Sequence, residues 1–237
     1  MDQDRQYEAL DLGLIDYEQA WQMQAEFAGE IAAGARLPSL LLLEHPHVYT
    51  FGRKGRAENL LLNEFQLQEK NIRVHWVDRG GDITYHGPGQ LVGYPIIPLQ
   101  GRNHQGSLDT LAYLRKLEEM IIQALARLGL PTGQKPGATG VWVQADVWSR
   151  CPRCQPGDRS KPAKLASIGV KVDARGITRH GFALNVDPDM SYWQGIIACG
   201  LQDEPIAALA DLLVPSPSMQ VVKQEIIRTF GEVFFPL

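Results

Sequence analysis

The chain has 237 residues, 44% hydrophobic and 21% charged, proportions typical of a globular protein that buries a large core. Its 23 basic and 27 acidic side chains leave a net charge of −4, which excludes a general polyanion binder, so we expect no nucleic-acid partner. The longest apolar runs, such as Leu40–Leu43, are too short to cross a bilayer, and the first residues carry no export signal. The three cysteines form no disulfide framework. We therefore expect a cytoplasmic enzyme that does not associate with membranes.

Helix and strand patterns alternate in clusters along the chain. Apolar residues recur at helical spacing from an N-cap at Asp16 to Gly34, from an N-cap at Ser107 to Gly129, and over 218–234. Apolar or β-branched segments bounded by glycine and proline predict strands at 10–14, 39–44, 48–51, 72–77, 83–85, 91–97, 141–147, 165–172 and 177–186. Because helices fall between clusters of strands, this order predicts an α+β fold with a mixed sheet, and no boundary divides residues 1–237 into two domains.

The densest group of reactive and conformationally special residues is the run Arg79-Gly80-Gly81-Asp82-Ile83-Thr84-Tyr85-His86-Gly87-Pro88-Gly89-Gln90. Adjacent glycines let backbone N–H groups approach a ligand closely, Arg79 supplies a fixed cation, and His86 titrates near neutral pH. The alternative is a glycine hairpin with an exposed arginine and a structural histidine. Four glycines, a proline, an arginine and a histidine within twelve positions favour one wall of a pocket instead.

Cys199 and Lys164 are the candidate reactive side chains. Cys199 follows the apolar stretch Ile196-Ile197-Ala198, where a free cysteine is more commonly an inert core residue than a nucleophile. Lys164 precedes a predicted buried strand, where a lysine often extends its amine to solvent. A lysine ammonium beside a thiol favours the thiolate, and a neutral amine can act as a general base. Sequence spacing alone does not pair the two residues.

Two further patterns are weak signals for a metal. Cys151-Pro152-Arg153-Cys154 is a single Cys-x-x-Cys pair, whereas structural zinc commonly uses four ligands, so a polar loop is favoured over a metal or redox site. His45 and His47 flank Pro46, which disrupts the hydrogen-bond ladder of a strand, so loop and strand-end residues are favoured over a metal pair. We therefore expect no metal site.

With these residues in place, the chain resembles the lipoyl (octanoyl) transferase family. The run from Arg79 to Tyr94 is similar to the signature of that family almost position for position. Further family motifs follow in order at Glu44-His45, Thr50-Phe51-Gly52-Arg53, Gly140-Val141-Trp142, Lys164-Leu165-Ala166-Ser167-Ile168-Gly169, Thr178-Arg179-His180-Gly181-Phe182-Ala183-Leu184-Asn185-Val186 and Ile197-Ala198-Cys199-Gly200. The resemblance covers roughly residues 10 to 200, so it is not confined to one motif.

The resemblance implies the fold of biotin and lipoate protein ligases and an octanoyl transfer that begins endogenous protein lipoylation. The donor would be octanoyl-acyl carrier protein, and the acceptors would be lysines in lipoyl domains of 2-oxoacid dehydrogenase complexes and in glycine cleavage H protein. Cys199 would carry the acyl group as a thioester and Lys164 would tune it, with no cofactor and no metal. The acyl pocket would be formed by Arg79, Gly80, Gly81, Asp82, Ile83, Thr84, Tyr85 and His86, by Ser167, Ile168 and Gly169, and by Gly181, Phe182 and Ala183.

Two departures from the family pattern and three competing functions accompany this interpretation. The stretch 151–164 is longer than the usual turn, and Ser167 stands where alanine is common, which bears on chain-length preference. The competing functions are an ATP-dependent lipoate or octanoate ligase on the same fold, a non-catalytic acyl-binding protein, and an amidotransferase between lipoyl domains. We expect both protein partners to be acidic, so that Arg53, Lys54 and Arg56 attract them.

Overall fold

The computed structural model describes residues 6–99, 101, 108–148, 161–198 and 204–236. Among these residues, seven strands form a mixed sheet in the order β1-β2-β6-β10-β9-β8-β7, in which β1 and β2 run parallel and the other neighbours are antiparallel. The strands are β1 (Glu8–Leu14), β2 (Ser39–Glu44), β6 (Gln90–Ile96), β10 (Thr178–Asn185), β9 (Ala163–Val172), β8 (Ala138–Val143) and β7 (Gly133–Lys135). The predicted α+β fold with a mixed sheet is confirmed.

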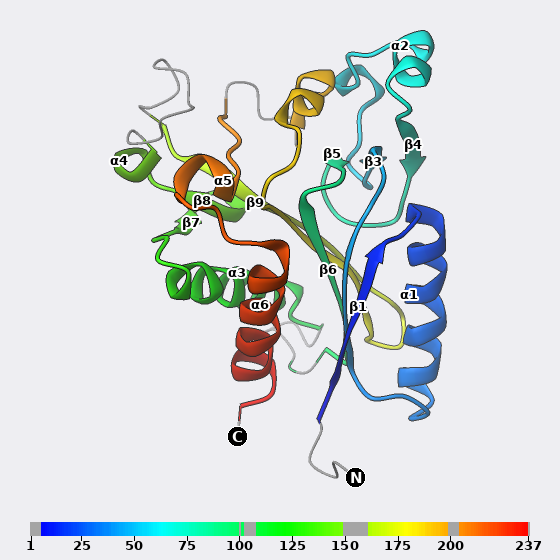
Figure 1. The fold of residues 1–237 in the computed structure, drawn as a ribbon. Helices are drawn as coiled ribbons and strands as arrows, with labels where there is room; N and C mark the ends of the chain where they lie inside the picture. Colours follow the sequence, from blue (N-terminus) through cyan, green and yellow to red (C-terminus); the bar gives the residue numbers. More distant parts are fainter. Residues whose placement is uncertain (1–5, 100, 102–107, 149–160, 199–203, 237) are drawn as a thin grey trace.

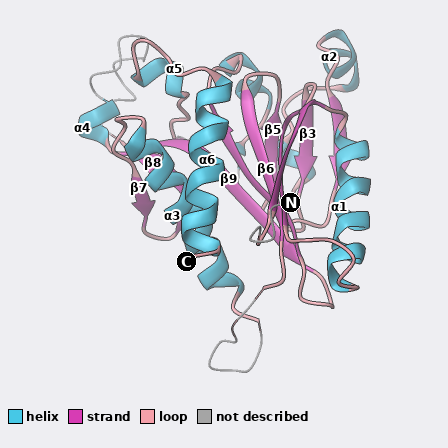
Figure 2. Ribbon diagram, turned by 60° about the horizontal axis from the view of Figure 1, so that its bottom comes forward, coloured by secondary structure: helices cyan, strands magenta, loops and turns pink. Residues whose placement is uncertain are grey.

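Helices cover both faces of this sheet (Figures 1 and 2). Helix α1 (Tyr17–Ala32) packs on one face, and α3 (Thr110–Arg127) and α6 (Met219–Phe234) pack together on the other. Along β2, Leu40 and Leu42 join the core beneath α3 and α6, whereas Leu41 and Leu43 join the core beneath α1. Because each face is covered, β2 has a continuous apolar sequence instead of an alternating one.

A second, smaller sheet carries part of the loop that the sequence singled out. In the described chain it contains β4 (Arg73–Trp76), β3 (Val48–Phe51) and β5 (Ile83–His86), in that order. Its core includes residues of, or next to, η1 (Ala57–Asn59), α2 (Glu64–Glu69) and η3 (Met190–Gly195). The loop between β4 and β5 reaches the large sheet, where the N–H of Gly80 donates to the carbonyl of Val170 at 2.9 Å. This contact brings the two sheets together at the predicted pocket wall.

Several predicted boundaries differ from the structure. Helix α3 begins at Thr110 and is capped by Asp109, which accepts from Ala112 N at 2.9 Å; the predicted cap, Ser107, lies outside the described residues. The strand predicted at 141–147 begins at Ala138 and ends at Val143, after which the chain forms α4 (Ala145–Trp148). The apolar residues at 145–148 suit a short helix as well as a strand, so the pattern could not separate the two.

The sequence patterns did not predict several short helices and strands. Helix α2 has no buried residue and therefore no apolar stripe, although Asn63 and Gln66 form a capping box. Strand β7 has only three residues, and α5 (Leu209–Leu212) has only four. Within the part of the chain that the structure describes, no helix combines the length and apolarity needed to cross a membrane.

Candidate active site

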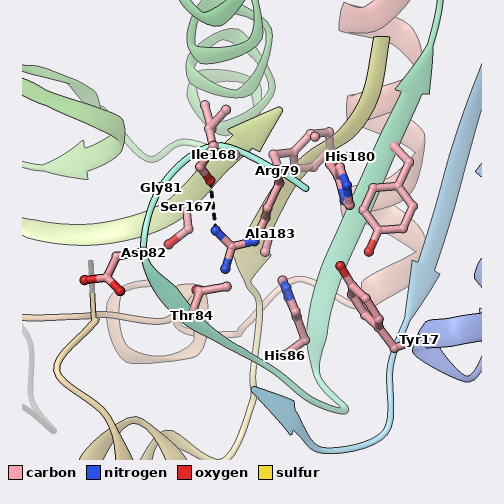
Figure 3. Close-up of a pocket in the computed structure, with 15 residues that line it drawn as sticks. Tyr17, Arg79, Gly81, Asp82, Thr84, His86, Ser167, Ile168, His180 and Ala183 are labelled. Atoms are coloured by element: carbon pink, nitrogen blue, oxygen red, sulfur yellow. Dashed lines mark hydrogen bonds between the residues drawn. The ribbon is translucent and has the colours of Figure 1, made fainter. Parts of the chain in front are cut away.

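A narrow cavity of about 50 Å³ lies where the β4–β5 loop meets β9 and β10 (Figure 3). Its wall contains twelve of the fourteen predicted pocket residues and three others. They are Arg79, Gly80, Gly81, Asp82, Thr84, His86, Ser167, Ile168, Gly169, Gly181, Phe182 and Ala183, together with Tyr17, Tyr94 and His180. The structure therefore brings together three segments that are as far apart as residues 79 and 183 in the sequence.

The other two predicted pocket residues, Ile83 and Tyr85, do not line this cavity. Successive side chains of a strand point to opposite faces, so on β5 Thr84 and His86 face the cavity while Ile83 and Tyr85 face the core of the small sheet. Both are fully buried there, and the hydroxyl oxygen of Tyr85 lies 2.9 Å from Nδ1 of His47. Their contribution is to packing behind the wall.

Glycines on three neighbouring strands allow this part of the sheet to pack closely. Gly181 of β10 is paired with Gly169 of β9, and Phe182 is paired with Gly93 of β6. A Cβ on Gly181 would lie 2.1 Å from the carbonyl oxygen of Gly93, and one on Gly93 would lie 2.2 Å from the Phe182 ring. A side chain at Gly181 would collide with the backbone of β6, and one at Gly93 would collide with the Phe182 ring, which explains why glycine is needed in these motifs.

Arg79 fastens the loop on which it lies. Its guanidinium donates to the carbonyl and hydroxyl of Thr50 on β3 and, at 2.9 Å, to the carbonyl of Gly80. The side chain is buried and lines the cavity. The fixed cation predicted at this position therefore lies in the cavity wall, and its N–H groups also hold the backbone of that wall.

His86 belongs to a buried chain of hydrogen bonds. Its Nδ1 lies 2.8 Å from Oε1 of Gln90, and because an amide oxygen only accepts, Nδ1 carries the proton. Gln90 donates in turn to Oδ1 of Asn185 at 2.9 Å, and Asn185 donates to the carbonyl of Ala207. Complete burial lowers the pKa of His86 well below its usual value. The imidazole is therefore neutral near pH 7, with Nε2 available as an acceptor.

One end of the cavity has a polar aromatic wall. In Figure 3, Tyr17 and His180 lie at one end of the labelled residues and Asp82 lies at the other. Burial raises the pKa of the Tyr17 and Tyr94 phenols, so both remain neutral hydroxyls. Oγ1 of Thr84, a buried hydroxyl on the wall, has no hydrogen-bond partner among the described residues.

A wider cleft of about 770 Å³ adjoins the narrow cavity. The two share Gly80, Gly81, Asp82, Ile168 and Gly169. Lys164 and Ile197 line the cleft together with the exposed basic residues Lys54 and Arg56. Lys164 itself is largely buried, and its Nζ lies 5.2 Å from the centre of the Trp142 ring.

The segment that leads to Cys199 is fixed against this cleft. The N–H of Ile197 donates to the carbonyl of Asn59 at 2.8 Å, and Asn59 donates through its side chain to Asp82. Asp82 also accepts from the backbone N–H of Arg56 at 3.1 Å. The described residues break off after Ala198 and resume at Glu204, so Cys199 itself lies outside them.

This arrangement of glycine loop, cavity and cleft can be compared with known proteins. Residues 16–231 match the lipoyl protein ligase A/B catalytic domain. The chain belongs to this family. A protein of Cytophaga hutchinsonii named octanoyltransferase is 40% identical in an alignment 237 positions long, which covers 94% of this chain and 91% of that protein. The resemblance to octanoyltransferases is thus confirmed, and the family member described here is an acyltransferase.

Solved structures share the fold of this family member. A putative lipoate protein ligase from T. acidophilum has a TM-score of 0.67 at 16% identity, covering 97% of this chain and 85% of the other. A lipoate-protein ligase A bound with ATP has a TM-score of 0.66 at 15% identity, with the same coverage of both chains. At these identities the likeness concerns the fold alone.

Three residues of the cavity wall were not identified in advance. His180 and Tyr94 were part of the family motifs but were assigned no role, and Tyr17 was only a member of the apolar stripe of a helix. An apolar stripe predicts which face of a helix is buried, but it does not predict which residues that face packs against. His180 also has a φ of +56°, which is uncommon for a residue with a side chain.

The histidines considered as a metal pair serve other contacts. Nδ1 of His45 donates to the carbonyl of Ile15 and its Nε2 accepts from Tyr94, both at 2.8 Å, while His47 contacts Tyr85. Among the described residues, no group of three or more His, Cys, Asp or Glu side chains is arranged to hold a metal ion. Cys151 and Cys154 lie outside the described residues.

Proposed function

We propose that the chain transfers an octanoyl group from octanoyl-acyl carrier protein to a lysine of a lipoyl domain, through a thioester on Cys199. Residues 1–237 would act as one octanoyltransferase domain. The observation that carries the proposal is that a narrow cavity opens beside a wide cleft lined by Lys164 and Ile197, which precedes Cys199 by two residues. The names of the relatives and the match over residues 16–231 support the same conclusion.

The narrow cavity suits an acyl chain and the wide cleft suits the reacting groups. Each buried methylene of an alkyl chain contributes about 0.8 kcal/mol to the free energy of binding. Octanoyl is therefore favoured over shorter chains, provided that the cavity has room for the additional methylenes. Phe182, Ala183 and Ile168 supply apolar wall for the chain. Ser167 lies on the same wall, so its hydroxyl would influence which chain length fits.

In the first half-reaction, the Cys199 thiolate attacks the carbonyl carbon of the donor thioester. A new C–S bond forms to Cys199, the C–S bond to the carrier breaks, and the carrier leaves as a thiolate that takes up the proton of the Lys164 ammonium, which becomes a neutral amine. An ammonium at Lys164 stabilises the attacking thiolate by charge. The donor is already an activated ester, so the step requires neither ATP nor a cofactor.

In the second half-reaction, the amine of the acceptor lysine attacks the acyl-cysteine. An amide C–N bond forms, the C–S bond to Cys199 breaks, and the surplus amine proton passes to the neutral amine of Lys164 or to the leaving sulfur. Both half-reactions pass through an oxyanion, for which preorganised backbone N–H groups near Gly81 and Gly169 are the available donors. The same lysine thus acts as a cation first and as a base second.

Protein partners would reach Cys199 from the side of the wide cleft. Lys54 and Arg56 line it and Arg53 is adjacent and exposed, so this side attracts acidic surfaces although the whole chain has a net charge of −4. Acyl carrier protein would be the donor. Lipoyl domains of 2-oxoacid dehydrogenase complexes and glycine cleavage H protein would be the acceptors.

Intact-protein mass spectrometry tests the proposal. Incubation with octanoyl-acyl carrier protein and no ATP should give an octanoyl adduct that hydroxylamine removes and that a lipoyl domain discharges. Cys199→Ala should give no adduct while keeping the thermal midpoint of the wild type. An adduct on Cys199→Ala at the wild-type rate would contradict the nucleophile. Acceptor modification that requires ATP and free octanoate would instead indicate a ligase.

Variants of Lys164 separate its two roles. Lys164→Ala should slow both half-reactions, each by roughly 100-fold or more, the usual effect of losing acid–base catalysis. Lys164→Arg keeps a cation that cannot act as a base, so thioester formation should be slowed less than transfer to the acceptor amine. Equal loss in both half-reactions for Lys164→Arg would contradict the assignment of the base.

A further inference from the structure

Glu118 is a fully buried carboxylate outside the proposed chemistry. It lies on α3, its relative exposure is 0%, and it is not part of the wall of either the cavity or the cleft. Burying a carboxylate is costly unless hydrogen bonds and charges compensate it. Here Oε2 accepts from Nη1 of Arg115 at 2.6 Å, and Oε1 accepts from the backbone N–H of Gly140 at 3.0 Å. The carboxylate therefore joins α3 to β8.

The sheet alone does not fix the backbone of β8 at Gly140. The pairing of β8 with β9 shifts register between Val141 and Trp142, and the pairing of β7 with β8 is also irregular. Gly140 has a φ of +128°, a conformation open to glycine and rarely adopted by other residues. Glu118 supplies the acceptor for the Gly140 N–H at this irregular point, and it holds that strand segment in place.

Gly140 in turn borders the path of the Lys164 side chain. A Cβ on Gly140 would lie 2.7 Å from Cε of Lys164 and 2.5 Å from the carbonyl oxygen of Ala166. Trp142, two residues along β8, is paired with Lys164 in the sheet and has its ring 5.2 Å from Nζ. The aliphatic part of Lys164 thus runs between the bare backbone of Gly140 and the ring of Trp142, both on β8.

We propose that Glu118 is a positioning residue for Lys164: by holding Gly140, it sets the channel that directs the lysine amine into the wide cleft. This inference rests on the proposed role of Lys164 in acyl transfer. It also accounts for glycine in the Gly140-Val141-Trp142 motif, where any side chain would displace the lysine.

The test measures single-turnover formation of the octanoyl thioester from octanoyl-acyl carrier protein. Glu118→Ala should lower this rate by about 100-fold, the order expected when a catalytic group moves by about 1 Å. Glu118→Gln keeps a side chain of the same length, whose amide oxygen can still accept from the Gly140 N–H. Its rate of thioester formation should stay within about 10-fold of the wild-type rate, because Arg115 is partly exposed and can turn away from the new amide. Glu118→Asp keeps the charge but is one methylene shorter, so it should be slower than Glu118→Gln.

If Glu118→Ala does not fold, the relative rates of Glu118→Gln and Glu118→Asp test the positioning role of Glu118. If Glu118→Asp forms the thioester faster than Glu118→Gln, the inference is overturned, because the rate would then depend on the negative charge of the side chain and not on its length. Leu125→Ala is the matched control: Leu125 is a fully buried residue of the same helix in the core between α3 and α6. It should lower the thermal midpoint without slowing the reaction more than about 3-fold, since it removes packing and leaves both hydrogen bonds of Glu118 in place.

A double-mutant cycle separates positioning from general damage. In a Lys164→Ala background, Glu118→Ala should slow thioester formation by less than about 3-fold further, because the residue it positions is gone. Additive losses, with Lys164→Ala itself strongly impaired, would overturn the inference and leave the proposed function standing. Wild-type rates for Lys164→Ala would overturn the proposed role of Lys164 together with this inference.

Discussion

Nε2 of His180 lies 2.7 Å from Oδ1 of Asp78, and this contact joins the loop on one side of the narrow cavity to the strand on the other. Asp78 immediately precedes Arg79, and His180 lies on β10. Lys171 of β9 and Arg179 of β10, which are paired in the sheet, also form ion pairs with Asp78. One carboxylate thus holds the glycine loop against two strands of the large sheet.

Asp78→Asn should destabilise the protein at pH 7 by about 1.5–3 kcal/mol, the range for hydrogen bonds to a charged group. The hydrogen bond from His180 holds the pKa of Asp78 well below its usual range, with Lys171 and Arg179 adding to the effect. A lowered carboxylate pKa stabilises the fold above the unfolded pKa of about 3.9, and the gain is lost as pH falls below it. Urea unfolding should therefore show that the difference between wild type and variant shrinks as pH falls below about 4.

Lys171→Gln gives a graded comparison for Asp78→Asn. It removes one of the ion pairs and leaves Arg179 and His180 in contact with the carboxylate. Its effect on the free energy of unfolding should be smaller than that of Asp78→Asn. An equal or larger effect would mean that the loop is not held mainly through Asp78.

Acid should destabilise the protein well above the pKa of its carboxylates. His45 is buried, and burial lowers its pKa from 6.5 to about 4; its Nδ1–H donates to Ile15 while Nε2 accepts from Tyr94. Between these two values the unfolded chain binds a proton that the folded chain does not. Stability should therefore fall as pH falls from about 6.5 to 4, with a limiting slope of about 1.4 kcal/mol per pH unit for this one group.

The variant His45→Asn tests the assignment to this residue. Asparagine can still donate to the carbonyl of Ile15 but does not titrate in this range. The variant should be less stable at pH 7 and should show a shallower decrease between pH 6.5 and 4 in urea unfolding. A slope equal to that of the wild type would assign the acid sensitivity to other groups, such as His86, whose pKa burial also lowers.

The sequence predicted the long elements well because each has a local signal. The cap of α1 at Asp16 is confirmed, as are the helix predicted over 218–234 and the continuous apolar strand β2. What it could not predict is which side of a strand faces which partner. Ile83 and Tyr85 lie in the same motif as Thr84 and His86, but they pack in the core of the small sheet and face away from the cavity. Contacts such as His180 with Asp78 join residues about 100 positions apart and have no local signal.

Gly52→Ala should displace the wall of the narrow cavity. A Cβ at Gly52 would lie 2.4 Å from the carbonyl oxygen of Gly81 and 2.7 Å from Nη1 of Arg79, so backbone must move. Overpacking of this kind costs about 1–3 kcal/mol, and octanoyl transfer should fall with the loss of the wall. Gly29→Ala in α1 is the control, because its Cβ would have no contact closer than 3.7 Å. Gly29→Ala should raise the free energy of unfolding by about 0.5–1 kcal/mol and keep full activity. An active Gly52→Ala would show that the loop position is not needed.

Charge reversal at the cleft should weaken the approach of acidic partners. Lys54 and Arg56 are exposed on the rim of the wide cleft, where attraction to an acidic carrier raises the rate of encounter. Lys54→Glu combined with Arg56→Glu should lower kcat/KM for octanoyl-acyl carrier protein by about 10-fold or more at low salt, and the difference should shrink towards 1 M salt as the Debye length falls to about 3 Å. Arg228→Glu, an exposed site on α6, is the control and should change kcat/KM little. A deficit that persists at high salt would mean that the two residues act through direct contacts and not through long-range attraction.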